Sequence, residues 1–158
     1  MAKGKLIVLE GIDGSGKSAQ YRRLCARFDE AGMAYHHIVF PRYDQESSAL
    51  IRMYLNGAFG THPSDVNAYA ASTFFAVDRY ASYRTDWGEI YENGGLILSD
   101  RYTTSNAIHQ GSKLPEAELP AFFDWLYDLE YGKLGLPRPD LVLYLDMPIE
   151  VSQKLLLQ

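Results

Sequence analysis

A run of eight residues near the start of the chain has the pattern of a phosphate-binding loop. The run is Gly11-Ile12-Asp13-Gly14-Ser15-Gly16-Lys17-Ser18, which matches G-x-x-x-x-G-K-[ST] without a gap. Glycines let backbone N–H groups turn inward around a phosphate, and the first turn of a following helix adds partial positive charge. In this pattern the lysine reaches the β- and γ-phosphates and the serine hydroxyl ligates Mg²⁺. We therefore predict that this loop binds a nucleoside triphosphate.

Two arginines follow predicted strands, at the positions where ligands bind in parallel α/β sheets. Arg42 comes after Phe40-Pro41, and Arg101 comes after Asp100. A kinase that joins two polyanions needs such arginines to cancel their repulsion locally. Asp100 follows an apolar run, the position from which an acid helps to hold Mg²⁺. The alternative for each arginine is a solvated loop residue, and the place at a strand end favours the functional interpretation.

Phe75 and Arg79 are four residues apart on a predicted helix, so they lie on one face. The pair suits a nucleotide, with the ring stacked on the base and the guanidinium on the phosphate. The alternative is a core phenylalanine beside an ion pair of Asp78, and the residue types alone favour that alternative. A switch GTPase is excluded, because no asparagine is followed by lysine as its guanine-reading motif Asn-Lys-x-Asp requires.

Strands and helices are predicted to alternate along the whole chain. The patterns predict strands at 5–10, 34–40, 96–98 and 141–146, and helices at 16–31, 47–55, 64–91, 103–110, 116–131 and from 149 onward. This alternation predicts an α/β protein, a three-layer sandwich with a parallel sheet and helices on both faces. Such a sheet brings the carboxyl ends of its strands, and the polar residues after them, to one edge.

Three local signals make sharper predictions. Ser64 is the expected N-cap of the long helix, with Asp65 in its first turn. Residues 141–145 are apolar at successive positions, which predicts a strand buried on both faces. Leu155-Leu156-Leu157-Gln158 lie in a predicted helix without a stop signal, so we expect residues 1–158 to be a single kinase domain, incomplete on its C-terminal side.

The composition argues against several classes of protein. The 158 residues are 47% hydrophobic and 22% charged, the balance of one globular domain. A net charge of −5, from 15 basic and 20 acidic residues, argues against a nucleic-acid partner. No apolar run approaches the roughly 20 residues of a membrane helix, and no signal peptide is apparent. The single cysteine, Cys25, lies on an apolar helix face, which favours core packing, and its isolation favours a cytoplasmic location.

Five segments of the chain, in order, resemble the thymidylate kinase family of P-loop nucleoside monophosphate kinases. They cover residues 9–18, 40–43, 74–79, 100–106 and 137–146, and so extend along the whole chain. The phosphate-binding loop alone occurs in many families. Its acid Asp13, the Phe-Pro-Arg at 40–42, the helical Asp-Arg at 78–79 and the Asp-Arg-Tyr at 100–102 are together specific.

The resemblance implies transfer of the γ-phosphoryl group of MgATP to dTMP, in homodimers packed through their long helices. Residues 11–18 would then bind ATP, and Ser18 and Asp100 would hold Mg²⁺. The catalytic residues implied are Lys17, Arg101 and Asp13, with Asp13 near the 3′-hydroxyl of the acceptor. Phe75 would stack on thymine, Asn106 would lie near its edge, and Arg42, Arg79 and Arg101 would clamp the phosphate. The implied acceptor site comprises Asp13, Phe40, Arg42, Phe75, Arg79, Arg101, Asn106, His109 and Gln110.

Three positions depart from the pattern of the family. Gly14 stands where some relatives carry an arginine, which implies that catalytic arginines come from a mobile lid after the fourth strand. His109 stands where many relatives have an aromatic residue against the sugar, which leaves selection against a 2′-hydroxyl open. Ala19 stands where many such loops have a second hydroxyl.

Two alternative functions are left open by the sequence. One is a P-loop kinase for another nucleoside monophosphate or for a deoxynucleoside. A deoxynucleoside kinase would use a carboxylate at the end of the second strand, where Arg42 stands here. The other alternative is a nucleotide-binding module without catalytic activity.

Overall fold

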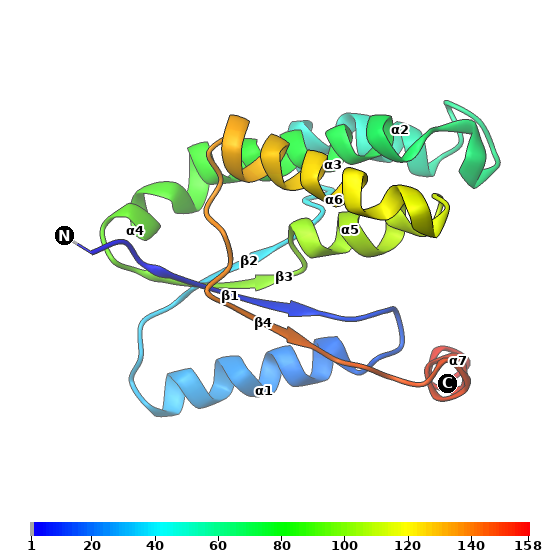
Figure 1. Ribbon diagram of the computed structural model, residues 1–158. Coiled ribbons are helices and arrows are strands. Elements are labelled where there is room, and N and C mark those ends of the chain that lie inside the picture. The colour runs from blue at the N-terminus through cyan, green and yellow to red at the C-terminus, as the bar shows by residue number, and fades with distance from the viewer. Residues whose placement is uncertain (1) are drawn as a thin grey trace. The chain divides into compact units, whose positions relative to one another are not determined.

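A parallel β-sheet forms the centre of the first of two structural units (Figure 1). The structure is a computed structural model that describes residues 2–158. The first unit gathers the chain up to Ile38, Glu89–Arg101 and Pro139–Gln158, and the second comprises Val39–Gly88 and Tyr102–Arg138. Each unit is compact in its own internal contacts.

The sheet has four strands in the order β2-β3-β1-β4. They are β1 (Lys5–Glu10), β2 (His36–Val39), β3 (Leu96–Asp100) and β4 (Leu141–Tyr144). Strand β1 pairs in parallel with β3 and with β4, in a register that sets Leu9 beside Asp100 and Leu143. The predicted α/β class with a parallel sheet is therefore confirmed, and the register brings Asp100 to the end of β1, where the phosphate-binding loop begins.

Helix α1 (Lys17–Glu30) follows that loop and packs on the sheet. Its buried Tyr21 joins Leu9 and Leu98 in one apolar cluster, against which Cys25 also packs. This confirms core packing for the cysteine. Helix α4 (Gly88–Glu92) leads into β3, and α7 (Ile149–Leu156) follows β4.

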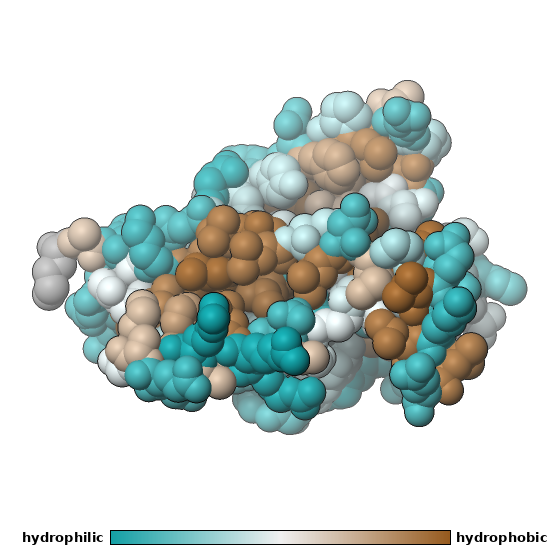
Figure 2. Space-filling view, turned by 90° about the horizontal axis from the view of Figure 1, so that it is seen from below, coloured by the Kyte–Doolittle hydropathy of each residue, from teal (hydrophilic) through white to brown (hydrophobic). Residues whose placement is uncertain are grey.

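Strand β4 is exposed, contrary to the prediction from its apolar sequence. Leu141, Val142, Leu143 and Tyr144 are 49%, 38%, 40% and 50% exposed. The reason lies in the topology, since β4 is the last strand of the described sheet and pairs only with β1. A groove of about 660 Å³ runs between β4 and α1, lined by Leu24, Arg23 and Arg27 from the helix and by residues of the strand. Figure 2 shows apolar side chains gathered on the face that carries α1.

The second unit is helical. Its α-helices are α2 (Ala49–Leu55), α3 (Ala68–Ser82), α5 (Thr103–Gly111) and α6 (Leu119–Tyr127). Short 3₁₀ turns precede several of them, namely η1 (Glu46–Ser48), η2 (Pro63–Asp65) and η4 (Glu116–Glu118), and π-helical segments follow α3 and α6, namely η3 (Tyr83–Trp87) and η5 (Asp128–Lys133). Helix α3 packs on α5 and α6 around Ala68, Phe122 and Leu126.

The long predicted helix at 64–91 differs from the observed one in two respects. Its N-cap is Asn67, whose side chain accepts a hydrogen bond of 2.8 Å from the Ala70 N–H. The predicted cap Ser64 lies in η2, a separate turn that His62 and Asp65 close with a capping box. At the other end the helix passes from α3 into the π-helical turn η3 and then α4, so the extent was predicted well but not the change in winding.

Candidate active site

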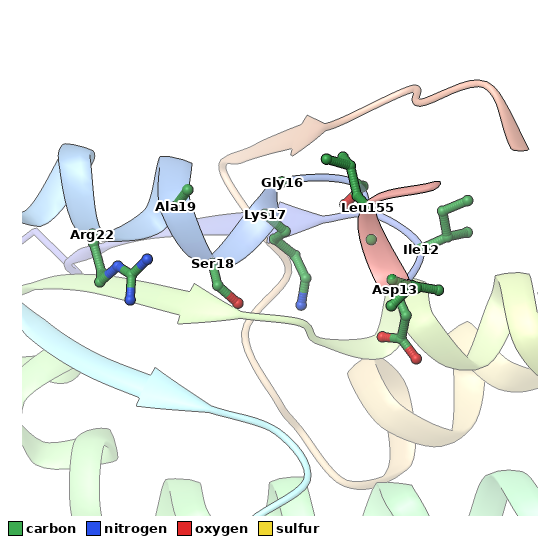
Figure 3. Close-up of a pocket in the computed structure, with 11 residues that line it drawn as sticks. Ile12, Asp13, Gly16, Lys17, Ser18, Ala19, Arg22 and Leu155 are labelled. Atoms are coloured by element: carbon green, nitrogen blue, oxygen red, sulfur yellow. The ribbon is translucent and has the colours of Figure 1, made fainter. Parts of the chain in front are cut away.

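The phosphate-binding loop links β1 to α1 and adopts a backbone that only glycine takes easily. Gly14 and Gly16 have φ angles of +78° and +80°. A Cβ at Gly14 would also lie 2.5 Å from the carbonyl oxygen of Ser152 in α7, so a larger residue has no room in this arrangement. The loop borders a pocket of about 510 Å³, lined by residues 12–19 together with Arg22, Leu155 and Leu156 (Figure 3). The lining contains seven of the eight motif residues, all except Gly11.

Lys17 and Asp100 form an ion pair at the mouth of this loop. The Lys17 ammonium donates to the Asp100 carboxylate, and both side chains are largely buried. In Figure 3 the side chains of Lys17, Ser18 and Asp13 extend to one side of the loop. Two predicted features, the loop lysine and the acid at the end of β3, are thus brought together by the structure.

Arg101 is held between two carboxylates. Its Nη1 donates to Glu10 at 3.2 Å, and its Nη2 donates to Asp13 at 2.9 Å. Its backbone is left-handed, with φ at +68°, and its N–H donates to the Leu9 carbonyl at 3.0 Å. A non-glycine residue in this conformation is uncommon and costs free energy. The strained turn places the guanidinium beside the phosphate-binding loop.

In the second unit, Arg42 is organised by Asp78. The Asp78 carboxylate accepts the Arg42 backbone N–H at 2.9 Å and the Ser47 hydroxyl at 2.6 Å. The Arg42 side chain lies along it, with Nε 3.6 Å from Asp78 Oδ1, and its Nη2 donates to Ser47 Oγ at 3.3 Å. Asp78 is the member of the helical Asp-Arg pair that the sequence left without a function.

Arg79 is buried in an ion pair with Glu130. Its Nε and Nη2 donate to the two carboxylate oxygens, the second at 2.8 Å, and Thr103 donates to the same carboxylate at 2.9 Å. The side chains of Arg79 and Glu130 are 2% and 0% exposed. Burial lowers the pKa of the Arg79 guanidinium, but the charge and hydrogen bonds of Glu130 more than offset this, so the pKa lies above its ordinary value. The Arg79 charge is therefore balanced within the protein.

The remaining predicted acceptor residues differ in their surroundings. Phe75 is half-buried and meets Tyr54 edge-on, with ring centroids 6.4 Å apart. Phe40 is buried against Tyr102, and Asn106 is buried with its Nδ2 donating to the Ser72 carbonyl at 3.1 Å. Gln110 is also buried, and its Oε1 has no hydrogen-bond partner in the described part of the chain. His109 is exposed.

Sequence reasoning did not find that Asp78 and Glu130 are the carboxylates that hold Arg42 and Arg79. Glu10, at the end of β1, supports the site from behind, since its carboxylate orients Arg101. Glu130 went unnoticed, although a signal existed: it follows Phe122 and Leu126 at intervals of four and so continues the buried face of a helix. A charged residue on such a face is almost always paired when it is buried.

This fold and loop define the class of protein. A strand, a glycine-rich loop, a helix and an acid at the end of the neighbouring strand are together the phosphate-binding half of a P-loop nucleotide kinase. The family model for thymidylate kinase matches residues 9–156. The chain belongs to the thymidylate kinase family.

Individual relatives agree with this assignment. The chain is 34% identical to the thymidylate kinase of Mycobacterium tuberculosis over 148 residues, which cover 93% of this chain and 68% of that protein. It is 31% identical to human thymidylate kinase over 152 residues, covering 96% of this chain and 65% of that protein. A solved thymidylate kinase from Candida albicans matches 98% of this chain and 68% of its own, with a TM-score of 0.69 and 28% identity. The chain thus spans about two thirds of the length of these relatives.

The part of the chain that the structure describes has neither a cluster of metal ligands nor a membrane-spanning helix. Within residues 2–158, no three His, Cys, Asp or Glu side chains are grouped in a way that would hold a metal ion. In the same part of the chain, no helix is long and apolar enough to cross a membrane.

Proposed function

We propose that this chain transfers the γ-phosphoryl group of MgATP to dTMP and gives dTDP and ADP. The observation that carries the proposal is the Lys17–Asp100 pair at a complete phosphate-binding loop, in a chain of the thymidylate kinase family. A coupled assay of ADP release with dTMP, dUMP, dGMP and dCMP tests it. We expect turnover with dTMP to exceed that with dGMP and dCMP, and turnover of either of those above dTMP would contradict the proposal.

The donor site would be built from residues 11–18. Ser15 Oγ is buried in this loop and has no hydrogen-bond partner among residues 2–158, as is expected of a group that a ligand satisfies. The Ser18 hydroxyl and the Asp100 carboxylate offer hard oxygen ligands, which suit Mg²⁺. When bound with ATP, Mg²⁺ neutralises charge on the phosphates. Asp100 would then exchange part of its contact with Lys17, leaving the lysine for the transferred phosphate.

No general base is needed for this reaction, because the acceptor phosphate is already an anionic nucleophile. The protein contributes by positioning the two substrates and by neutralising their charges. Lys17 and Arg101 suit that role in the first unit, and Asp13 orients Arg101 through its hydrogen bond of 2.9 Å. We assign catalysis to these three residues.

The second unit would supply most of the residues that bind the acceptor. Arg42 is the residue best suited to the dTMP phosphate, since it lies at the end of β2 and its side chain keeps 15% of its surface exposed. Arg79 would contribute hydrogen-bond donors to the acceptor but little net positive charge, because the Glu130 carboxylate neutralises its guanidinium. Phe40, Phe75, Asn106, His109 and Gln110 would surround the nucleoside, and the unpartnered Gln110 Oε1 is an acceptor for a ligand.

Two matched variants test which part of the acceptor each residue contacts. Arg42→Ala is expected to weaken dTMP binding by about 10-fold or more while leaving ATP and thymidine binding within about twofold, because it removes only a phosphate contact. Phe75→Ala is expected to weaken dTMP and thymidine alike, because it removes contact with the base. Isothermal titration calorimetry with all three ligands measures both. An Arg42→Ala protein that loses ATP and keeps dTMP would show that the assignment of sides is wrong.

We also propose that the protein forms homodimers in the cytoplasm. The support is a set of exposed apolar side chains on neighbouring helices α2 and α3, namely Leu50, Met53, Val77 and Tyr80. Exposed apolar side chains on helices that pack together suit a protein interface.

Met53→Glu is expected to convert the dimer to monomer, because it places a charge in the apolar interface. Sedimentation velocity measures the oligomeric state. Ile149→Glu is the matched control, since Ile149 is an exposed apolar residue of α7 in the other unit. A wild-type protein that sediments as a monomer at all concentrations would contradict the dimer.

A further inference from the structure

The loop that carries Arg42 is fastened at two places in the second unit. From α3, Asp78 accepts the Arg42 backbone N–H and the Ser47 hydroxyl. From α2, Arg52 Nη1 donates to the Tyr43 and Gln45 carbonyl oxygens, both at 2.9 Å. Arg52 Nη1 also donates to the Ser48 hydroxyl, but its contacts with this segment are to residues after Arg42, whereas Asp78 meets the Arg42 side chain itself.

Asp78 is placed to determine the direction of the Arg42 guanidinium. Its carboxylate is 1% exposed and is surrounded by the Arg42 N–H, the Arg42 Nε at 3.6 Å and the Ser47 hydroxyl. Ser47 in turn accepts from Arg42 Nη2 at 3.3 Å. Nη2 is thus engaged by Ser47, whereas Nε is buried, has no hydrogen-bond partner among residues 2–158 and faces the charge of Asp78. Among residues 2–158, Nη1 has no protein partner, so it is the part of the guanidinium that is offered to a ligand.

We propose that Asp78 is a positioning residue for the acceptor phosphate, which acts by holding Arg42 and its loop in the binding orientation. The proposal rests on the proposed function, in which Arg42 contacts the phosphate of dTMP. Two opposing effects are at work in this arrangement. The Asp78 charge repels a phosphate, but a guanidinium that is held in one orientation loses less entropy on binding. Because the Asp78 carboxylate is buried and already surrounded by donors, we infer that the orienting effect dominates.

The test compares dTMP with thymidine, which lacks the phosphate. Asp78→Asn is expected to weaken dTMP binding by about 10-fold, because the amide cannot accept from both Ser47 and the Arg42 N–H. Thymidine and ATP binding should stay within about twofold, since neither depends on Arg42. A merely structural role of Asp78 would weaken dTMP and thymidine together. Calorimetry measures all three affinities, and thermal unfolding verifies that the variant is folded.

Asp78→Glu separates orientation from charge and serves also if the asparagine variant does not fold. It keeps the carboxylate but moves it by the length of one methylene. If Asp78 acts by orienting Arg42, this variant should lose dTMP affinity to a similar extent as Asp78→Asn. Wild-type dTMP affinity in both variants would overturn the positioning role, and so would tighter dTMP binding in Asp78→Asn, which would show that the carboxylate mainly opposes the phosphate. Failure of the wild-type protein to bind dTMP would instead overturn the proposed function.

Discussion

Lys17→Ala is expected to lower the turnover number by about 10²-fold or more, because the lysine follows the charge that develops on the transferred phosphate. The other phosphate contacts expected of the loop come from backbone N–H groups, and these remain in place when the lysine side chain is removed. ATP binding should therefore fall much less than turnover. Steady-state kinetics with saturating dTMP, together with a titration of ATP, separates the two effects.

The matched control for this variant is Lys3→Ala. Lys3 lies in the same unit and pairs with Glu92 at 3.4 Å, but its side chain is 67% exposed. It should leave turnover unchanged, since exposed ion pairs contribute little. Turnover of Lys17→Ala within about threefold of the wild-type protein would remove the phosphate-binding loop from the proposed chemistry.

The loop and the strand that precedes it could be predicted in full from the sequence. The reason is physical. Gly14 and Gly16 permit φ angles near +80°, which the loop needs in order to turn its N–H groups toward a phosphate. Glycines at this spacing before a Lys-Ser pair are therefore specific for a phosphate-binding loop. The same holds for Asp100, because a parallel register carries the end of β3 to the end of β1. The sequence predicts these features because they depend on residues that are close in the sequence or that lie side by side on paired strands.

The partners of the arginines could not be predicted in this way. Arg79 and Glu130 are 51 residues apart, and Arg42 and Asp78 are 36 apart, so only the packing of the helices shows the pairs. The exposure of β4 likewise could not be inferred, since an apolar strand is the same in sequence whether or not a neighbour covers it. The change from α3 to the π-helical η3 has no sequence signal that we can identify.

Arg79→Ala is expected to lower the free energy of unfolding by about 3–5 kcal/mol, the usual cost of leaving one member of a buried ion pair without its partner. Among residues 2–158, the Glu130 carboxylate would then keep only the Thr103 hydrogen bond, at 2.9 Å, while remaining buried. Denaturation in urea, followed by circular dichroism, measures the change. Arg84→Ala is the control, because Arg84 is an exposed arginine in η3 and should change stability by about 0.5 kcal/mol or less.

The double variant Arg79→Met/Glu130→Met distinguishes stability from recognition. Replacing both members of a buried pair by apolar residues of similar size is often neutral or stabilising, so we expect most of the lost stability to return. Acceptor binding should not return, because the methionine has no N–H donors for dTMP. A double variant that is stable and still binds dTMP with wild-type affinity would show that the Arg79–Glu130 pair serves folding alone. A stable variant without dTMP binding would show that the pair is kept for the acceptor, since folding can be achieved without it.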